Sequence, residues 1–252
     1  MEEDSTLVFL IETKFNVAKM AEIKHKLERR QGMIVPSVCG SGGLALLWKD
    51  SLSVDVQTYS PRHIDAIITE DDGNKKWQFT RFYGHPKTSK REESWRSLVN
   101  LSTRSDLPSV CMRDFNEIIR RGEKVGGVER LEWHMRAFSL AINRSKLRHM
   151  GFVGPEFTWS RRLGARGWDR ERLDRALVST NWASLFPRVR LYNVVTCSSD
   201  HNMLILKTLP PKSRNKRRRR LFRFEEMWIK EGGCDGVVEE AWERGRILGG
   251  QN

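Results

Sequence analysis

The chain has 252 residues, 38% of them hydrophobic, and its 45 Lys and Arg against 32 Asp and Glu give a net charge of +13. This length allows a sizeable buried core, and so large a positive surplus favours a polyanionic partner such as nucleic acid. No apolar run reaches the roughly 18 residues of a membrane span, and the start lacks the basic region of a signal peptide. Four scattered cysteines indicate neither a zinc site nor a disulfide framework. We therefore expect a reduced, intracellular protein with no membrane partner.

Short apolar runs rich in β-branched and aromatic residues predict strands along most of the chain. In chain order they cover residues 6–14, 42–49, 52–70, 75–84, 107–115, 157–160, 172–179, 189–195 and 201–209. The sequence "DDGN" at 71–74 predicts a hairpin turn between the third and fourth of these strands. Apolar residues at helical spacing predict helices at residues 18–32, 89–103 and 130–150, the last being the longest.

This mixture predicts an α/β protein with two packed mixed sheets, because the strands are too many for one small sheet. After Pro210 and Pro211 the composition changes, and residues 212–220 carry seven basic residues and no acidic one. We expect one domain at residues 1–209, and a basic linker with a helical tail at 210–252. The run at 216–220 is a nuclear address, a phosphate-binding arm or a solvated linker.

Polar residues suited to metal and phosphate chemistry follow several of the predicted strands. They are Glu12, Tyr83, Asp114, Asn116, Asp174, Asp200 and His201. Hard oxygen ligands such as Glu12 and Asp200 suit Mg²⁺ or Mn²⁺, which proteins hold with one or two carboxylates, water and phosphate. Such a set can orient a water molecule and neutralise charge during displacement at phosphorus. Each stretch alone is more often a turn or a solvated face, so only their conjunction indicates a site.

Seven ordered stretches resemble the endonuclease/exonuclease/phosphatase family, most closely the endonuclease domain of plant LINE-type non-LTR retrotransposons. They are "IETK", "GGLALLWK", "RFYGHP", "RDFNEII", "FTWS", "ERLDRALVSTNWASLFP" and "SSDHNMLIL". The resemblance covers about residues 7–207 and implies a four-layer sandwich of two mixed sheets flanked by helices. The tail resembles the segment that leads toward reverse transcriptase in related polyproteins, although we expect no reverse transcriptase in this chain.

The resemblance implies metal-dependent hydrolysis of a DNA phosphodiester by a monomer that uses Mg²⁺, with Mn²⁺ as the other candidate. The implied roles are catalytic for Asp114, Asn116, His201, Asp174 and Tyr83, and metal binding for Glu12 and Asp200. Asp114 would orient or deprotonate the attacking water, and Asn116 would help to hold the phosphate. His201 would contact the scissile phosphate while Asp174 orients the ring, and Tyr83 would help with phosphate or leaving-group charge.

Three departures from the family pattern predict impaired activity. An earlier strand that carries a metal-side asparagine is expected to be missing, Arg113 replaces a glycine, and Met203 replaces a proline. The Arg113 guanidinium would cost several kcal/mol if buried unpaired, or would repel the metal if turned toward it. The alternatives are a catalytically inactive nucleic-acid-binding remnant and a phosphatase acting on a small phosphorylated substrate.

Overall fold

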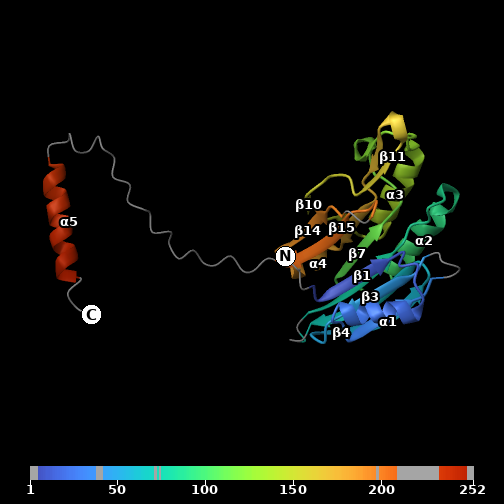
Figure 1. Ribbon diagram of the computed structural model, residues 1–252, viewed down its shortest axis with the longest axis horizontal. Coiled ribbons are helices and arrows are strands. Elements are labelled where there is room, and N and C mark those ends of the chain that lie inside the picture. The colour runs from blue at the N-terminus through green and yellow to red at the C-terminus, as the bar shows by residue number, and fades with distance from the viewer. Residues whose placement is uncertain are drawn as a thin grey trace. The chain divides into compact units, whose positions relative to one another are not determined.

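The computed structural model describes residues 5–37, 42–70, 73, 75–196, 199–208 and 233–248 (Figure 1). The chain divides into two compact units, Met1–Leu209 and Pro210–Asn252. In the second unit α5 (Cys234–Leu248) is a helix of 15 residues, and the predicted basic run at 212–220 lies outside the described residues. Because α3 (Glu132–Arg144) has only 13 residues, the prediction that 130–150 holds the longest helix is wrong.

A six-stranded mixed sheet forms the centre of the first unit. Its strands, in spatial order, are β4 (Leu52–Ser60), β5 (His63–Glu70), β6 (Lys76–Phe82), β7 (Ser109–Asp114), β13 (Asp174–Val178) and β9 (Arg148–His149). Only β6 and β7 pair in parallel within it. The single strand predicted for residues 52–70 is in fact β4 and β5, because the chain turns at Pro61 and Arg62 and proline cannot donate to a ladder.

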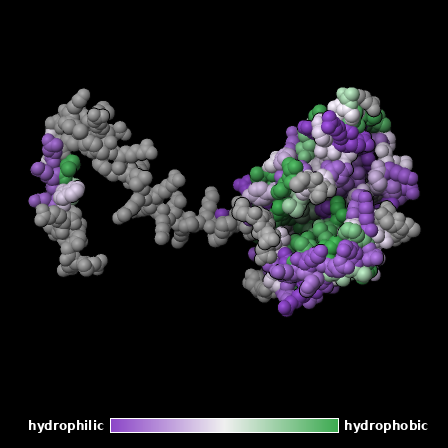
Figure 2. Space-filling view, viewed as in Figure 1, coloured by the Kyte–Doolittle hydropathy of each residue, from purple (hydrophilic) through white to green (hydrophobic). Residues whose placement is uncertain are grey.

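Two three-stranded sheets pack together against one face of the six-stranded sheet. One has the order β1 (Leu7–Ile11), β3 (Leu44–Trp48), β2 (Gln31–Val35), and the other β10 (Phe152–Val153), β14 (Val189–Val194), β15 (Met203–Thr208). Their inward side chains share one core with Ile64 and Val110 of the six-stranded sheet. Figure 2 shows hydrophobic side chains lining a hollow on this unit. Strands β1 and β15 lie at the outside of their sheets, and the absence of an earlier strand stays a prediction.

Helices cover the outer faces of both sheet layers. Helix α1 (Val17–Lys26) packs through Met20 against Ala45 and Leu47, on the face of β3 that points away from the central core. Helices α2 (Arg91–Ser102) and α3 cover the other face of the six-stranded sheet, where the rings of Trp95 and Phe138 stack 4.5 Å apart. The resulting order of helix, sheet, sheet and helix confirms the predicted four-layer sandwich.

A small sheet and short helices complete the first unit. The small sheet has the order β11 (Trp159–Arg162), β12 (Trp168–Glu171), β8 (Lys124–Val125). The short helices are η1 (Thr88–Lys90), η2 (Arg121–Glu123), η3 (Gly164–Arg166) and α4 (Thr180–Leu185). A bridge between Trp159 and His201 ties β11 to the segment that enters β15. Among the described segments, no helix is long and apolar enough to cross a membrane.

Candidate active site

Two carboxylates face each other at one end of the six-stranded sheet. Asp114 is the last residue of β7 and Asp174 the first of β13, and the antiparallel register sets them directly opposite. Directly opposed residues point to the same face of a sheet, so both side chains enter the same space. Both are nearly fully buried, with 2% of Asp114 and 3% of Asp174 exposed.

His201 joins these two carboxylates from the segment before β15. Its Nδ1 lies 2.8 Å from Oδ2 of Asp174, and its Nε2 lies 4.0 Å from Oδ2 of Asp114. Burial lowers the pKa of His201, but the hydrogen bond to Asp174 and the charges of Asp174, Asp114 and Asp200 outweigh it and raise the pKa to about 9. The ring is therefore an imidazolium near neutral pH, oriented by one carboxylate and facing the other.

A buried threonine fixes Asp174 in place. Oγ1 of Thr158, whose side chain is fully buried, accepts hydrogen bonds from the backbone N–H groups of Leu173, at 3.0 Å, and Asp174, at 2.8 Å. Thr196 holds the backbone of His201, because its hydroxyl donates a hydrogen bond to the carbonyl oxygen of that residue at 2.8 Å. Neither threonine was predicted as a site residue, although Thr158 lies within the stretch "FTWS".

Asn116 lies beside Asp114 in a tight turn. Its backbone N–H donates to Oδ1 of Asp114 at 2.8 Å, and its own φ of 53° is in the left-handed region that asparagine tolerates. Its side-chain amide donates to the carbonyl oxygen of Gly84 at 2.9 Å, while the Gly84 N–H donates to the carbonyl of Asp114 at 3.1 Å. These bonds tie the loop after β7 to the loop after β6.

Tyr83 and Glu12 form a second polar pair. The Tyr83 hydroxyl donates to Oε1 of Glu12 at 2.7 Å, joining the end of β6 to the residue after β1. Burial, followed by this hydrogen bond, raises the pKa of Tyr83 well above its ordinary value, so the phenol stays protonated. Tyr83 directly precedes Gly84, which binds Asn116, and it therefore lies next to the Asp114 loop.

The two predicted metal ligands retain oxygen atoms suited to a hard cation. Asp200 is exposed, and its Oδ2 accepts a hydrogen bond from the indole N–H of Trp159 at 2.9 Å. Glu12 is also exposed, and its Oε1 accepts the hydrogen bond from Tyr83. Within the described ranges no three His, Cys, Asp or Glu side chains form a ready metal cage. An arrangement of single carboxylates fits Mg²⁺ better than a metal that needs a full protein cage.

The structure thus brings four of the predicted residues, Asp114, Asn116, Asp174 and His201, into one cluster. Tyr83 and Glu12 pair beside that cluster, and Asp200, which neighbours His201 in sequence, bonds Trp159 instead of the cluster. The backbone of Arg113 pairs with Arg175 in the β7–β13 ladder. The side chain of Arg113 lies outside the described part of the chain, so its effect on the site stays a prediction.

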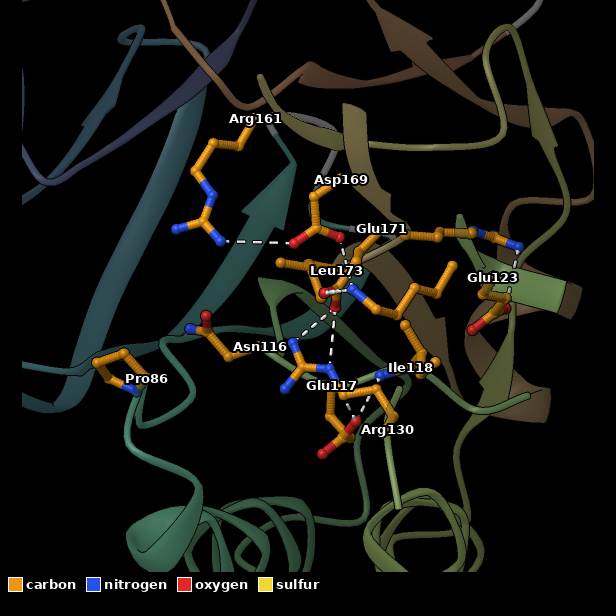
Figure 3. A network of polar contacts seen from close by, with 12 residues as sticks. Pro86, Asn116, Glu117, Ile118, Glu123, Arg130, Arg161, Asp169, Glu171 and Leu173 are labelled. Carbon is orange, nitrogen blue, oxygen red and sulfur yellow. Dashed lines mark hydrogen bonds and ion pairs between the residues drawn. The ribbon is translucent and has the colours of Figure 1, made fainter. Parts of the chain in front are cut away.

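An extended network of buried ion pairs lies next to the Asn116 loop, and the sequence did not reveal it (Figure 3). Glu117 is fully buried, and its carboxylate pairs with Arg91 of α2 at 2.6 Å and lies 4.0 Å from Arg130. Arg130 also pairs at 2.6 Å with Glu171, which binds Lys124 at the same distance. These contacts anchor the residue after Asn116 to α2 and to the small sheet.

The network continues to the surface of the small sheet. Lys124 also lies 2.5 Å from Asp169 of β12, whose other oxygen is 3.5 Å from the exposed guanidinium of Arg161 (Figure 3). A neighbouring pair joins Arg175 of β13 to Glu123 at 2.8 Å. Buried charges are tolerated only when paired and hydrogen-bonded, which is the arrangement seen here.

Comparison with known proteins identifies the family and the fold. A model of the Endonuclease/Exonuclease/phosphatase family matches residues 2–201. A search of the curated proteins gave no match. The endonuclease domain of TRAS1, a telomere-specific non-LTR retrotransposon, is structurally similar with a TM-score of 0.54 and 12% identity, over 81% of this chain and 99% of that one.

Two further solved structures share the fold. A 3' phosphatase, NExo, from Neisseria, bound to a product DNA hairpin, has a TM-score of 0.57 and 16% identity over 81% of this chain and 89% of its own. An AP endonuclease from Archaeoglobus fulgidus has a TM-score of 0.56 and 17% identity over 81% of this chain and 88% of that chain. At such identities the likeness concerns the fold.

Proposed function

Because this chain belongs to the Endonuclease/Exonuclease/phosphatase family, a family of nucleases and phosphodiesterase-type hydrolases, we propose that it hydrolyses a DNA phosphodiester with the help of Mg²⁺ or Mn²⁺. The observation that carries this proposal is the placement of His201 between Asp174 and Asp114. A histidine fixed by one carboxylate and facing a second is suited to proton transfer and to binding a phosphate oxygen. Retrotransposon origin is part of the proposal, supported by the fold of the TRAS1 endonuclease domain.

Each residue of the cluster has a separate role in the proposed reaction. The Asp174 carboxylate accepts a hydrogen bond from the Nδ1–H of His201 and fixes the ring, so that the Nε2–H can donate to the phosphate. Asp114, which the Asn116 N–H holds in position, orients the attacking water and accepts its proton. The protonated phenol of Tyr83 donates toward charge that develops on the phosphate or leaving group.

A divalent metal would be held by Glu12, with Asp200 as a second ligand. When bound, such an ion neutralises negative charge on the phosphate and polarises it for attack. Glu12 already receives a hydrogen bond from Tyr83, which orients the carboxylate at the end of β1. Asp200 would contribute carboxylate oxygen to such an ion, and its Oδ2 accepts a hydrogen bond from Trp159.

A basic hairpin beside the cluster supports DNA as the partner. Strands β11 and β12 expose Arg161, Arg162 and Arg170, and the Arg170 guanidinium lies 5.3 Å from the centroid of the Trp168 ring. The side chain of Trp168 is 46% exposed. Guanidinium groups bind phosphates and exposed aromatic rings stack on bases, so the hairpin offers both kinds of contact to a nucleic acid. The bridge from Trp159 to His201 connects this hairpin to the cluster.

Nicking of supercoiled plasmid in Mg²⁺ tests the proposal. We expect the purified chain to convert supercoiled DNA to open circles, EDTA to stop the reaction, and Asp114→Ala to abolish it. DNA binding without nicking would instead support the inactive remnant. Release of phosphate from a small phosphorylated compound, without action on DNA, would support the phosphatase alternative.

Salt dependence of DNA binding tests the partner separately. Deletion of residues 212–220 should weaken binding and flatten its dependence on salt, because up to seven basic residues would leave. An unchanged slope after the deletion would assign this run to a linker and leave the hairpin as the DNA contact.

A further inference from the structure

Arg81 enters the same space as the catalytic carboxylates from a neighbouring strand. In the parallel pairing of β6 and β7, Arg81 lies beside Met112, which is two residues before Asp114. Residues two apart in a strand point to one face, so Arg81, Met112 and Asp114 share the face that packs against β1. The Arg81 guanidinium accordingly lies 4.9 Å from the centroid of the Phe9 ring in β1.

The guanidinium of Arg81 lies near charged groups but makes no hydrogen bond with any residue that the structure describes. Its Nε is buried without an acceptor, and with the other described residues the structure records a ring contact for Arg81 but no hydrogen bond or ion pair. Burial lowers the pKa of Arg81, while the charges of Asp174 and Asp114 act in the opposite direction. The carboxylates thus act on the group through their charge, with no hydrogen bond between them and Arg81 recorded.

Arg91 and Arg175 also have a buried Nε without a partner, but they differ from Arg81 because each has a carboxylate partner. Arg91 has its Nη1 2.6 Å from Glu117, and Arg175 has its Nη2 2.8 Å from Glu123. A partly enclosed cation without such a partner costs free energy that folding must offset. An unsatisfied donor next to a proposed active site is explained most simply by a ligand that supplies the missing acceptor.

We propose that Arg81 binds an oxygen of the substrate phosphate at the His201 cluster, an inference that rests on the proposed phosphodiester substrate. The planar guanidinium presents several donors in a fork that matches the spacing of phosphate oxygens. Its place on β6, two residues before Tyr83, sets it on the strand whose end carries another proposed phosphate contact. Arg81 is then a binding residue that neutralises phosphate charge from within the sheet layer.

Thermal unfolding with inorganic phosphate tests this role in the metal-free protein. Arg81→Gln removes the charge, Arg81→Lys keeps it without the fork, and Arg96→Gln on the exposed side of α2 is the matched control. We expect millimolar phosphate, in EDTA, to raise the Tm of the wild type and of Arg96→Gln, and to leave that of Arg81→Gln unchanged. Equal stabilisation of Arg81→Gln would overturn the proposal. Without phosphate, Arg81→Gln should melt no lower than the wild type, since it loses an unpartnered cation.

DNA affinity separates this inference from the proposed function. By fluorescence anisotropy in EDTA, Arg81→Gln should raise the Kd for a short duplex by about 10-fold or more, and Arg81→Lys by less. If the wild type nicks plasmid in Mg²⁺ but Arg81→Gln binds DNA normally, the phosphate role is wrong and the function stands. If Arg81→Gln loses affinity but the wild type never nicks, the binding role stands and the proposed hydrolysis fails. If Arg81→Gln does not fold, the DNA affinity of Arg81→Lys is compared with that of the wild type instead. An unchanged Kd in Arg81→Lys would contradict phosphate binding by the forked guanidinium.

Discussion

The charges around His201 and the charges around Glu117 lie on adjoining loops, yet they are satisfied in different ways. In the Glu117 network three carboxylates, Glu117, Glu171 and Asp169, contact three enclosed cations, Arg91, Arg130 and Lys124, at 2.5 to 2.6 Å. In the His201 cluster two carboxylates share a single titratable ring, and the nearby Arg81 makes no ion pair with a described residue.

This difference separates residues that stabilise the fold from residues that we propose act on the substrate. Each cation of the Glu117 network already contacts a carboxylate, and removing a buried member can leave its partner buried and unpaired. A titratable ring and an unsatisfied guanidinium can change partners when a phosphate arrives. We therefore expect substitutions in the two regions to act on different measurements.

The largest expected effect is on catalysis by the His201 cluster. His201→Ala should lower plasmid nicking by about 1,000-fold or more, because it removes both a proton donor and a phosphate contact. Asp174→Asn should lower it by about 100-fold, since an amide no longer fixes the same tautomer. The rate of open-circle formation measures both, with His25→Ala on α1 as a matched control. A nicking rate that survives both changes would remove the site assignment.

The next effect concerns stability and the Glu117 network. Glu117→Ala should lower the free energy of unfolding by about 3–5 kcal/mol, because the buried guanidinium of Arg91 loses its carboxylate partner. Urea unfolding measures this change. The control is Glu132→Ala, whose ion pair with Arg136 is mostly exposed, and its loss should be less than about 0.5 kcal/mol. Equal losses for the two variants would show that burial does not distinguish the network.

The pH dependence of stability is expected to be smaller and to arise in the His201 cluster. The folded pKa of His201, about 9, exceeds the unfolded value of 6.5, so its contribution is complete below pH 6.5 and is lost as pH rises through 9. In EDTA, the free energy of unfolding should fall by about 1–2 kcal/mol more in the wild type than in His201→Gln between pH 6.5 and 9.5, allowing for partial exposure of the ring. Parallel pH profiles would contradict the raised pKa.

The smallest effect should come from Arg161, which touches the network and also belongs to the basic hairpin. Its side chain is 61% exposed and 3.5 Å from Asp169, so Arg161→Gln should change stability by less than about 0.5 kcal/mol. Its DNA affinity should fall a few-fold, and the logarithmic salt slope should drop by about one. A clear loss of stability with an unchanged salt slope would place Arg161 with the buried network instead.

Local sequence patterns were enough to predict much of the fold. The helix expected at residues 89–103 is α2 at Arg91–Ser102, because its apolar residues recur on one face. The residues of the cluster were found because strand ends collect polar side chains, and the register of β7 and β13 brings Asp114 and Asp174 together. The break between β4 and β5 was missed although Pro61 marks it, because the apolar residues on either side continue the strand pattern.

The supporting contacts could not be predicted, because they join residues far apart in the chain. Arg91 and Glu117 are 26 positions apart, and Lys124 and Glu171 are 47 apart. A single sequence shows their charges but not their pairing, and most charged residues lie on the surface. The proposed phosphate-binding role of Arg81 could not be predicted for the same reason. It depends on the register of β6 with β7 and on the absence of a partner among the described residues.

The outward position of β1 has a consequence for how the protein behaves in concentrated solution. Among the described strands β1 pairs only with β3, and its sequence, LVFLI, has neither a lysine nor a proline to blunt the open edge. Such an edge is a template for self-association between copies, and here the net charge of +13 opposes it by repulsion. Salt screens that repulsion over about 10 Å at 0.1 M but leaves backbone hydrogen bonding intact. We therefore expect turbidity of the nucleic-acid-free protein to rise with added salt.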